Sequence, residues 1–124
     1  MRTFQCPQCN SYSLKITASI DLPYDHKWDD ITLQTVKCAG CGFTGLATYL
    51  ESRRGALDSE TWYHDGYHVS KEVVGKVTKY IKNCPKPRDK RCGCASHKAL
   101  GMKDEAFRWV FISNLSDARP FPMT

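Results

Sequence analysis

Hydrophobic and polar residues alternate along two segments in the first third of the chain. Every second position is apolar or threonine at Leu14, Ile16, Ala18 and Ile20, and again at Ile31, Leu33 and Thr35. A period of two is typical of strands that bury one face. Residues 21–30 contain one proline and four acidic residues, which predicts a loop between two antiparallel strands. The segment 43–51 predicts a third strand.

A period of three to four residues replaces the alternation after residue 70. Its apolar positions are Val73, Val74, Val77, Tyr80 and Ile81. Ser70 is a suitable N-cap, and Pro85 prevents the helix from continuing. The pattern predicts an amphipathic helix of about three turns with lysines on its polar face.

The end of the chain shows a weaker pattern. Phe107, Trp109 and Phe111 alternate with other residues, which predicts a closing strand. Residues 119–124 include two prolines and predict a loose tail.

The segment 53–68 combines three aromatic residues with His64 and His68. We expect packed aromatic rings and hydrogen-bonded histidines under a connecting loop, because Gly66 argues against a helix that would align the two histidines. The alternative is a catalytic zinc bound by these histidines, with Asp65 or Glu60 as the general base.

Length and composition limit the class of protein. The chain has 124 residues, 41% of them hydrophobic, and a formal net charge of +5, which fits one domain with a modest core. Its apolar runs, such as 109–112, are far too short to cross a bilayer. The N-terminal residues show no apolar signal stretch. We therefore expect no membrane partner and a cytoplasmic, reducing location.

Seven cysteines dominate the candidate chemistry. In a reducing compartment spaced cysteines are more often metal ligands than disulfides. Two pairs, each with two residues between its members, supply four thiolates for a tetrahedral structural zinc: Cys6 and Cys9, and Cys38 and Cys41. Asn10 and Gly42 tolerate the left-handed backbone that leaves such a turn. A redox-active dithiol or an iron–sulfur cluster are the alternatives.

A second group of ligands lies within 14 residues in the second half of the chain: Cys84, Cys92, Cys94 and His97. Three thiolates and an imidazole complete a second zinc set, so we expect two zinc ions. Neighbouring prolines and a glycine keep this segment out of regular structure. In one alternative His64 or His68 replaces His97 or a cysteine, and in another these cysteines are free in a surface loop.

Residues 4–51, with two cysteine knuckles joined by a hairpin and followed by a strand, resemble the zinc-ribbon superfamily. That resemblance implies a β-ribbon fold, found in transcription factors, polymerase and ribosomal subunits, and primases. Asp29 and Asp30 also stand where the ribbon of transcript-cleavage elongation factors carries an acidic pair that positions a catalytic magnesium. We favour solvated hairpin-tip acids instead, because residues 25–28 lack the glutamine and arginine of that family.

Positive charge is concentrated in one region. Residues 71–103 contain 10 basic and 2 acidic side chains, whereas residues 1–70 contain 6 and 8. A localised basic patch suits a phosphate backbone, because lysine and arginine release its condensed counterions. The predicted nucleic-acid contacts are Lys79, Lys82, Arg88, Lys90, Arg91 and Lys98.

These patterns predict a small, zinc-stabilised α+β protein. Residues 1–52 form an antiparallel zinc ribbon, and residues 53–124 pack on it with one amphipathic helix, a Cys-rich zinc-binding loop and a closing strand. The expected function is binding to nucleic acid or to a nucleic-acid-processing complex. The alternatives are a protein–protein adaptor or regulator, for example of RNA polymerase, and a metal-dependent hydrolase. No phosphate loop, nucleophile elbow or Ser/His/Asp order is present, so no catalytic residue is predicted.

Overall fold

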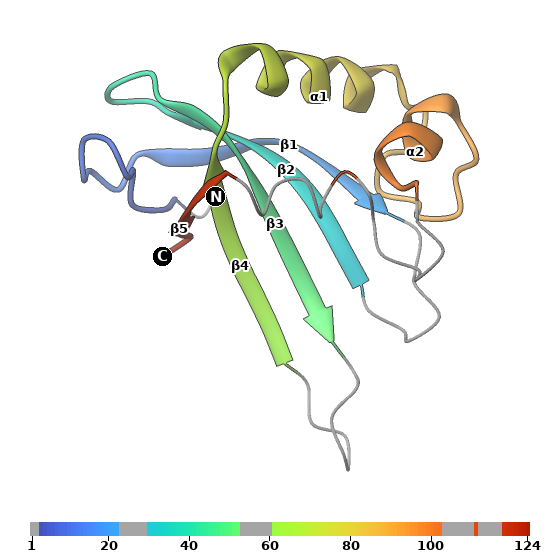
Figure 1. The fold of residues 1–124 in the computed structure, drawn as a ribbon, viewed down its shortest axis with the longest axis horizontal. Helices are drawn as coiled ribbons and strands as arrows, with labels where there is room; N and C mark the ends of the chain where they lie inside the picture. The colour runs from blue at the N-terminus through green and yellow to red at the C-terminus, as the bar shows by residue number, and fades with distance from the viewer. Residues whose placement is uncertain (1–2, 23–29, 53–60, 103–110, 112–117) are drawn as a thin grey trace.

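The computed structural model describes residues 3–22, 30–52, 61–102, 111 and 118–124. Within these ranges the chain forms β1 Leu14–Leu22, β2 Asp30–Cys38, β3 Thr44–Ser52, β4 Thr61–His68, α1 Lys71–Asn83, α2 Ala95–Leu100 and β5 Arg119–Pro122. The strands make an antiparallel sheet in the order β1-β2-β3-β4-β5, and α1 packs along it (Figure 1). The predicted α+β class, with a sheet, an amphipathic helix and two Cys-rich groups, is confirmed.

The first three strands form where the sequence predicts them. Leu33 of β2 pairs with Ile20 of β1 on one side and with Thr48 of β3 on the other. A register shift between Ile16 and Ala18 interrupts the β1–β2 ladder, as a β-bulge does. The predicted loop is shorter than expected, since β1 continues to Leu22, and residues 23–29 lie outside the described part.

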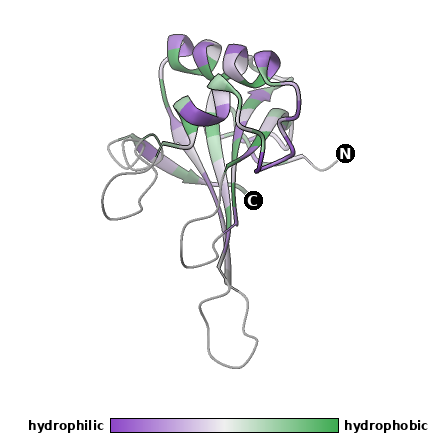
Figure 2. Cartoon of the chain, turned by 90° about the vertical axis from the view of Figure 1, so that its right-hand side faces the viewer, coloured by the Kyte–Doolittle hydropathy of each residue, from purple (hydrophilic) through white to green (hydrophobic). Residues whose placement is uncertain are grey.

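Helix α1 also matches its prediction at both ends. The hydroxyl of Ser70 accepts a hydrogen bond from the backbone N–H of Val73. The last helical residue is Asn83, and Cys84 is the C-cap just before Pro85. Hydrophilic and hydrophobic positions alternate along α1, as the colours in Figure 2 show. Val74, Val77 and Ile81 are buried. Each such side chain contributes about 1.5–3 kcal/mol by leaving water.

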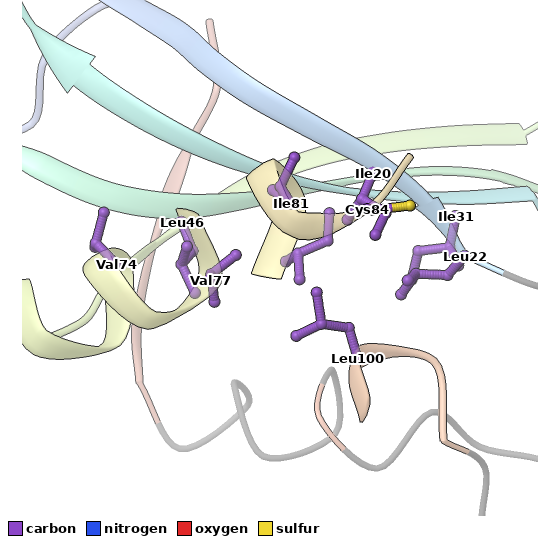
Figure 3. Close-up of a cluster of buried hydrophobic side chains, with 10 residues drawn as sticks. Ile20, Leu22, Ile31, Leu46, Val74, Val77, Ile81, Cys84 and Leu100 are labelled. Carbon is purple, nitrogen blue, oxygen red and sulfur yellow. The ribbon is translucent and has the colours of Figure 1, made fainter. Parts of the chain in front are cut away.

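The sheet separates two hydrophobic clusters. Between α1 and the sheet lies the helix-side cluster (Figure 3), which comprises Ile20, Leu22, Ile31, Leu33, Leu46, Val74, Val77, Ile81, Cys84 and Leu100. The opposite-side cluster comprises Phe4, Cys6, Leu14, Val36, Cys38, Ala47, Phe121 and Met123. Ala47 faces away from its neighbour Leu46, because successive strand residues point to opposite faces.

Two predictions for the C-terminal half were wrong. Residues 61–68 are strand β4 rather than a connecting loop, and residues 119–122 are strand β5 rather than a loose tail. Gly66 pairs with Phe121 and leaves room for its ring over β4. Any other residue would place a Cβ only 2.2 Å from that ring. The two prolines of β5 are compatible with an edge strand, which pairs on one side only.

The predicted closing strand at 107–111 lies outside the described residues, apart from Phe111, which packs against the helix-side cluster. The closing strand that the structure describes is β5. Strand β3 pairs with β4 across the predicted domain boundary at residue 52. The division into 1–52 and 53–124 stays a prediction. None of the described helices has the length and apolar character needed to span a membrane.

Candidate metal centres

The first candidate metal centre, site 1, lies at the end of the sheet where β1 begins and β2 ends. Its four sulfurs come from Cys6, Cys9, Cys38 and Cys41, and they all lie within 4.8 Å of one another. The backbone N–H of Cys6 donates to Ser11 O at 2.8 Å and closes the first turn. The backbone N–H of Ala39 donates to Ser13 O at 2.9 Å and joins the second turn to the first. The structure therefore brings the predicted set into one place.

The spacing of the sulfurs fits a tetrahedral ion. Cys6 and Cys41 have their sulfurs 3.6 Å apart, and those of Cys9 and Cys38 are 3.7 Å apart. A disulfide would require about 2.05 Å. Zinc–sulfur bonds of about 2.3 Å place two tetrahedral sulfurs about 3.8 Å apart. The geometry of site 1 is thus compatible with one zinc ion.

The turns of site 1 have the predicted backbone. Asn10 and Gly42 adopt positive φ angles of 64° and 80°. The backbone N–H groups of Gln8 and Gly40 donate to the sulfurs of Cys6 and Cys38, at 3.4 and 3.3 Å. The Gly40 donor favours the thiolate of Cys38, the form that binds a metal.

The second candidate metal centre, site 2, forms where α1 ends. Its ligand atoms come from Cys84, Cys92, Cys94 and His97, again within 4.8 Å of one another. His97 belongs to α2, which the sequence did not predict, because the prolines and glycine before it indicated an irregular segment. The signal for this short helix is Cys94 itself: its sulfur caps α2 by accepting from His97 N–H at 3.4 Å.

His97 is oriented so that one ring nitrogen faces the sulfurs of site 2. Its Nδ1 lies 3.2 Å from the sulfur of Cys84 and 3.3 Å from that of Cys94. Its Nε2 lies 2.9 Å from the backbone oxygen of Asp21 in β1. A carbonyl oxygen only accepts, so Nε2 donates, and in the neutral ring Nδ1 is left with the lone pair that a metal takes. No local pattern in the sequence indicates this contact between Asp21 and His97, which are 76 positions apart.

Within each site the thiols differ in pKa. The backbone N–H of Cys41 lowers the pKa of Cys38 to about 6. The backbone N–H of Phe43 also favours the thiolate of Cys41, but burial and the neighbouring thiols outweigh it and raise that pKa to about 12. At site 2 the backbone N–H of His97 lowers the pKa of Cys94 to about 6, and burial raises that of Cys84 to about 11. Metal binding must therefore displace protons.

Two of the predicted nucleic-acid contacts attach the site 2 loop to the sheet. Arg88 pairs with Asp21 at 3.4 Å, and Lys90 pairs with Asp30 at 2.8 Å. The backbone N–H of Asp21 also donates to Pro87 O at 2.8 Å. Asp30 is therefore an ion-paired residue at the start of β2 rather than a solvated acid, and Asp29 lies outside the described residues. Ion pairs of this partly exposed kind contribute about 0–1 kcal/mol each.

His64 and His68 belong to neither group of ligands that the described residues form. The Nε2 atom of His64 lies 2.7 Å from Oε1 of Gln34, so this histidine is hydrogen-bonded, as expected. The ring of His68 meets those of Phe43 and Phe121 edge to face, and burial lowers its pKa. The alternative in which either histidine replaces a ligand of site 2 is wrong for this fold.

The remaining predicted contacts are exposed. Lys79 and Lys82 lie on the outer side of α1. Arg91 and Lys98 are exposed near site 2, where Lys90, Arg91, Cys92, Gly93, His97, Lys98, Gly101 and Met102 line a shallow hollow. The structure thus places three basic side chains around the outer surface of site 2.

No family model, curated protein or solved structure matches this chain. The zinc-ribbon-like character of residues 4–51 therefore rests on the cysteine cluster and the antiparallel sheet themselves.

Proposed function

We propose that this chain is a structural zinc protein with two ions, a member of the zinc-ribbon superfamily in its first half, and that it binds nucleic acid. The observation that carries the zinc assignment is the convergence of all seven cysteines and His97 into two groups of four ligand atoms. Each group supplies four protein ligands, which leaves no open position for substrate. That donor set supports structural roles and gives no support to a metal-dependent hydrolase.

The two sites would act at opposite ends of β1, which runs from Leu14 to Leu22. Site 1 would hold the start of β1 against the end of β2. Site 2 would hold the end of α1 against β1, because its ligand His97 also bonds to Asp21. Zinc would thereby supply part of the stability that a small core lacks.

The nucleic-acid part of the proposal rests on charge. Residues 71–103 carry 10 basic and 2 acidic side chains, and four of the predicted contacts in this region, Lys79, Lys82, Arg91 and Lys98, are exposed. Cationic side chains held on one rigid helix and one metal-bound loop would contact several phosphates at once. Arg88 and Lys90 would contribute less directly, because both are paired with carboxylates.

Salt-dependent binding of a labelled oligonucleotide tests this function. Replacing Lys79, Lys82 and Arg91 with glutamate should weaken binding at least tenfold and reduce its salt dependence, because fewer counterions are released. The matched control replaces Lys15 and Lys37 with glutamate, since both are exposed and pair with each other across β1 and β2, outside the basic region. Equal losses in the two variants would contradict a defined interface.

Binding that is absent at low salt would exclude the nucleic-acid role. The chain would then fit the alternative of a protein–protein adaptor or regulator. Zinc content must be measured for every variant, so that a loss of binding is not a loss of metal.

A further inference from the structure

The face of the sheet opposite α1 carries an exposed group of aromatic rings. Trp62 and Tyr63 follow each other in β4 and are both more than half exposed. Tyr63 points to the helix side, like Tyr67, which packs on the helix-side cluster. Trp62 and His64 therefore point to the other side. Tyr49 of β3 also points there, because its neighbour Leu50 packs on the helix-side cluster.

Contacts across the strands fix the positions of these rings. The ring of Tyr49 lies 6.5 Å from that of Trp62 at an angle of 25°, which is a stacked arrangement. The ring of His64 meets Tyr49 edge to face at 5.5 Å, and its Nε2 is held by Gln34. Together with Met123 and Thr124 the three rings line a hollow. We call Tyr49, Trp62 and His64 the aromatic face.

A second hollow adjoins the aromatic face and shares Tyr49 with it. Arg88 and Lys90 reach this hollow from the site 2 loop, and Asp21, Asp30 and Glu51 line it as well. Two of the carboxylates are paired with Arg88 and Lys90, and Glu51 accepts a hydrogen bond from the Tyr49 hydroxyl at 2.8 Å. The side chain of Arg88 is still 65% exposed, so its guanidinium remains open to an anion.

We propose that the aromatic face stacks unpaired bases of a single-stranded nucleic acid. This inference rests on the proposed function and specifies the substrate class as single-stranded. The exposed ring of Trp62 offers a flat surface of the kind on which bases stack, and Arg88 lies beyond Tyr49 where a neighbouring phosphate would pass. Bases in a duplex are stacked on each other and cannot reach such a surface.

The polar groups around the rings favour a nucleobase over an apolar protein surface. Thr32 and Gln34 lie on the same face as Tyr49, since Thr32 pairs directly with Tyr49 in the ladder. Thr32 donates to the Asp21 carboxylate at 2.6 Å, and His64 Nε2 lies 2.7 Å from Gln34 Oε1. These groups make the surroundings of the rings polar, and stacking on Trp62 carries the recognition of the base. Asp21 and Asp30 are ion-paired, whereas Glu51 keeps its charge beside the Tyr49 hydroxyl, so the phosphate contact depends on the exposed guanidinium of Arg88 rather than on the net charge of this hollow.

The test compares three probes: a single-stranded oligonucleotide of about 16 nucleotides, the same sequence as a duplex, and inorganic polyphosphate, which has charge but no bases. Trp62→Ala should weaken single-strand binding by roughly 5- to 100-fold, as loss of one or two stacked bases does. Polyphosphate binding should change less than about twofold, because the phosphate contacts of the basic region remain. Trp62→Phe should recover most of the affinity, because phenylalanine keeps an aromatic face.

Tyr63→Ala is the matched control. It removes an exposed aromatic residue from the same strand on the other face of the sheet, so single-strand affinity should stay within about twofold. Both variants should retain two zinc ions per chain, because neither residue is a ligand.

Three results would overturn the inference: equal losses for Trp62→Ala and Tyr63→Ala, equal losses for the oligonucleotide and polyphosphate, or unchanged binding by Trp62→Ala. If Trp62→Ala is unchanged while the glutamate variant at Lys79, Lys82 and Arg91 loses affinity, the proposed function stands and only the stacking site fails. If the unmodified protein binds none of the probes, both fail.

Discussion

Chelating the metal should unfold this protein, because cysteine ligands are part of both hydrophobic clusters. Cys6 and Cys38 are at most 1% exposed in the opposite-side cluster, and Cys84 is 6% exposed in the helix-side cluster. Without an ion, each buried sulfur is either a thiol with no metal or a thiolate in an apolar environment. The neutral thiol lacks the zinc–sulfur bonds, and the thiolate is penalised by its apolar surroundings, so the stripped protein loses the free energy that metal binding contributes to folding.

The magnitude follows from comparing two free energies. Structural zinc in a four-ligand site contributes about 10–16 kcal/mol of apparent binding energy at neutral pH. The complete free energy of unfolding of a domain is about 5–15 kcal/mol. Removing even one ion should therefore consume most of the stability, and removing both should leave no cooperative fold.

The measurement begins with elemental analysis, which should find two zinc ions per chain. The reduced protein is then stripped with EDTA and followed by near-ultraviolet circular dichroism and thermal unfolding. We expect loss of the near-ultraviolet signal and of the melting transition, with recovery on adding zinc but not magnesium, which prefers oxygen ligands. A stripped, reduced chain that still melts cooperatively at the original temperature would refute the structural role of the metal.

Two further predictions concern packing and protons. Gly66→Ala should destabilise the protein by about 1–3 kcal/mol, because the new methyl group overlaps the ring of Phe121. Gly75 is an exposed helical position where an added Cβ would contact no other side chain within 4 Å, so Gly75→Ala should instead stabilise the protein by up to about 1 kcal/mol. Chemical denaturation measures the free energy of unfolding of both variants. Equal effects would contradict the packing of Phe121 on Gly66. Zinc binding at pH 7.5 should release at least one proton per site, because Cys41 and Cys84, with pKa values raised to about 12 and about 11, are protonated before binding and ionised afterwards. The affinity for zinc should therefore rise with pH. Calorimetry in buffers of different ionisation enthalpy measures the number of protons released on zinc binding, and a value of zero would contradict these pKa shifts.

Local patterns were sufficient to predict the elements that bury one face over several residues. Alternation located β1 and β2, the segment after the second cysteine pair was predicted as β3, and the spacing of Val74, Val77 and Ile81 located α1. The cysteine spacing predicted site 1, because a turn with two intervening residues brings its two sulfurs together whatever the rest of the fold does. Site 2 was predicted from three cysteines and a histidine within 14 residues.

Elements that depend on distant partners were not predictable in this way. Strand β5 is short and contains two prolines, and it is held by the fit of Phe121 over Gly66, 55 positions earlier in the chain. Likewise, Gly66 indicated only that a helix was unfavourable. No local pattern links the two residues. Local patterns therefore predict a loop and a tail where the structure has paired strands.

Charge counting had the same limit at the site 2 loop. Arg88 and Lys90 add to a basic run in the sequence, but in the fold Arg88 pairs with Asp21 near the end of β1 and Lys90 pairs with Asp30 at the start of β2. Lys90 and Asp30 are 60 positions apart. The count predicts that the region is basic, and only the tertiary structure distinguishes cations that hold the loop from cations that are free to bind a phosphate.

That distinction connects the metal to the aromatic face. Asp21 accepts from His97 through its backbone oxygen and pairs with Arg88 through its side chain. The same residue therefore contacts a ligand of site 2 and the cation that borders the aromatic face. If zinc fixes His97, it also fixes the loop that carries Arg88 relative to Tyr49 and Trp62. Among molecules that stay folded, nucleic-acid affinity should then fall when site 2 alone is disrupted, even though no ligand of that site need contact the nucleic acid. Binding measured together with near-ultraviolet circular dichroism separates this effect from unfolding, and unchanged affinity of the folded fraction would contradict the coupling.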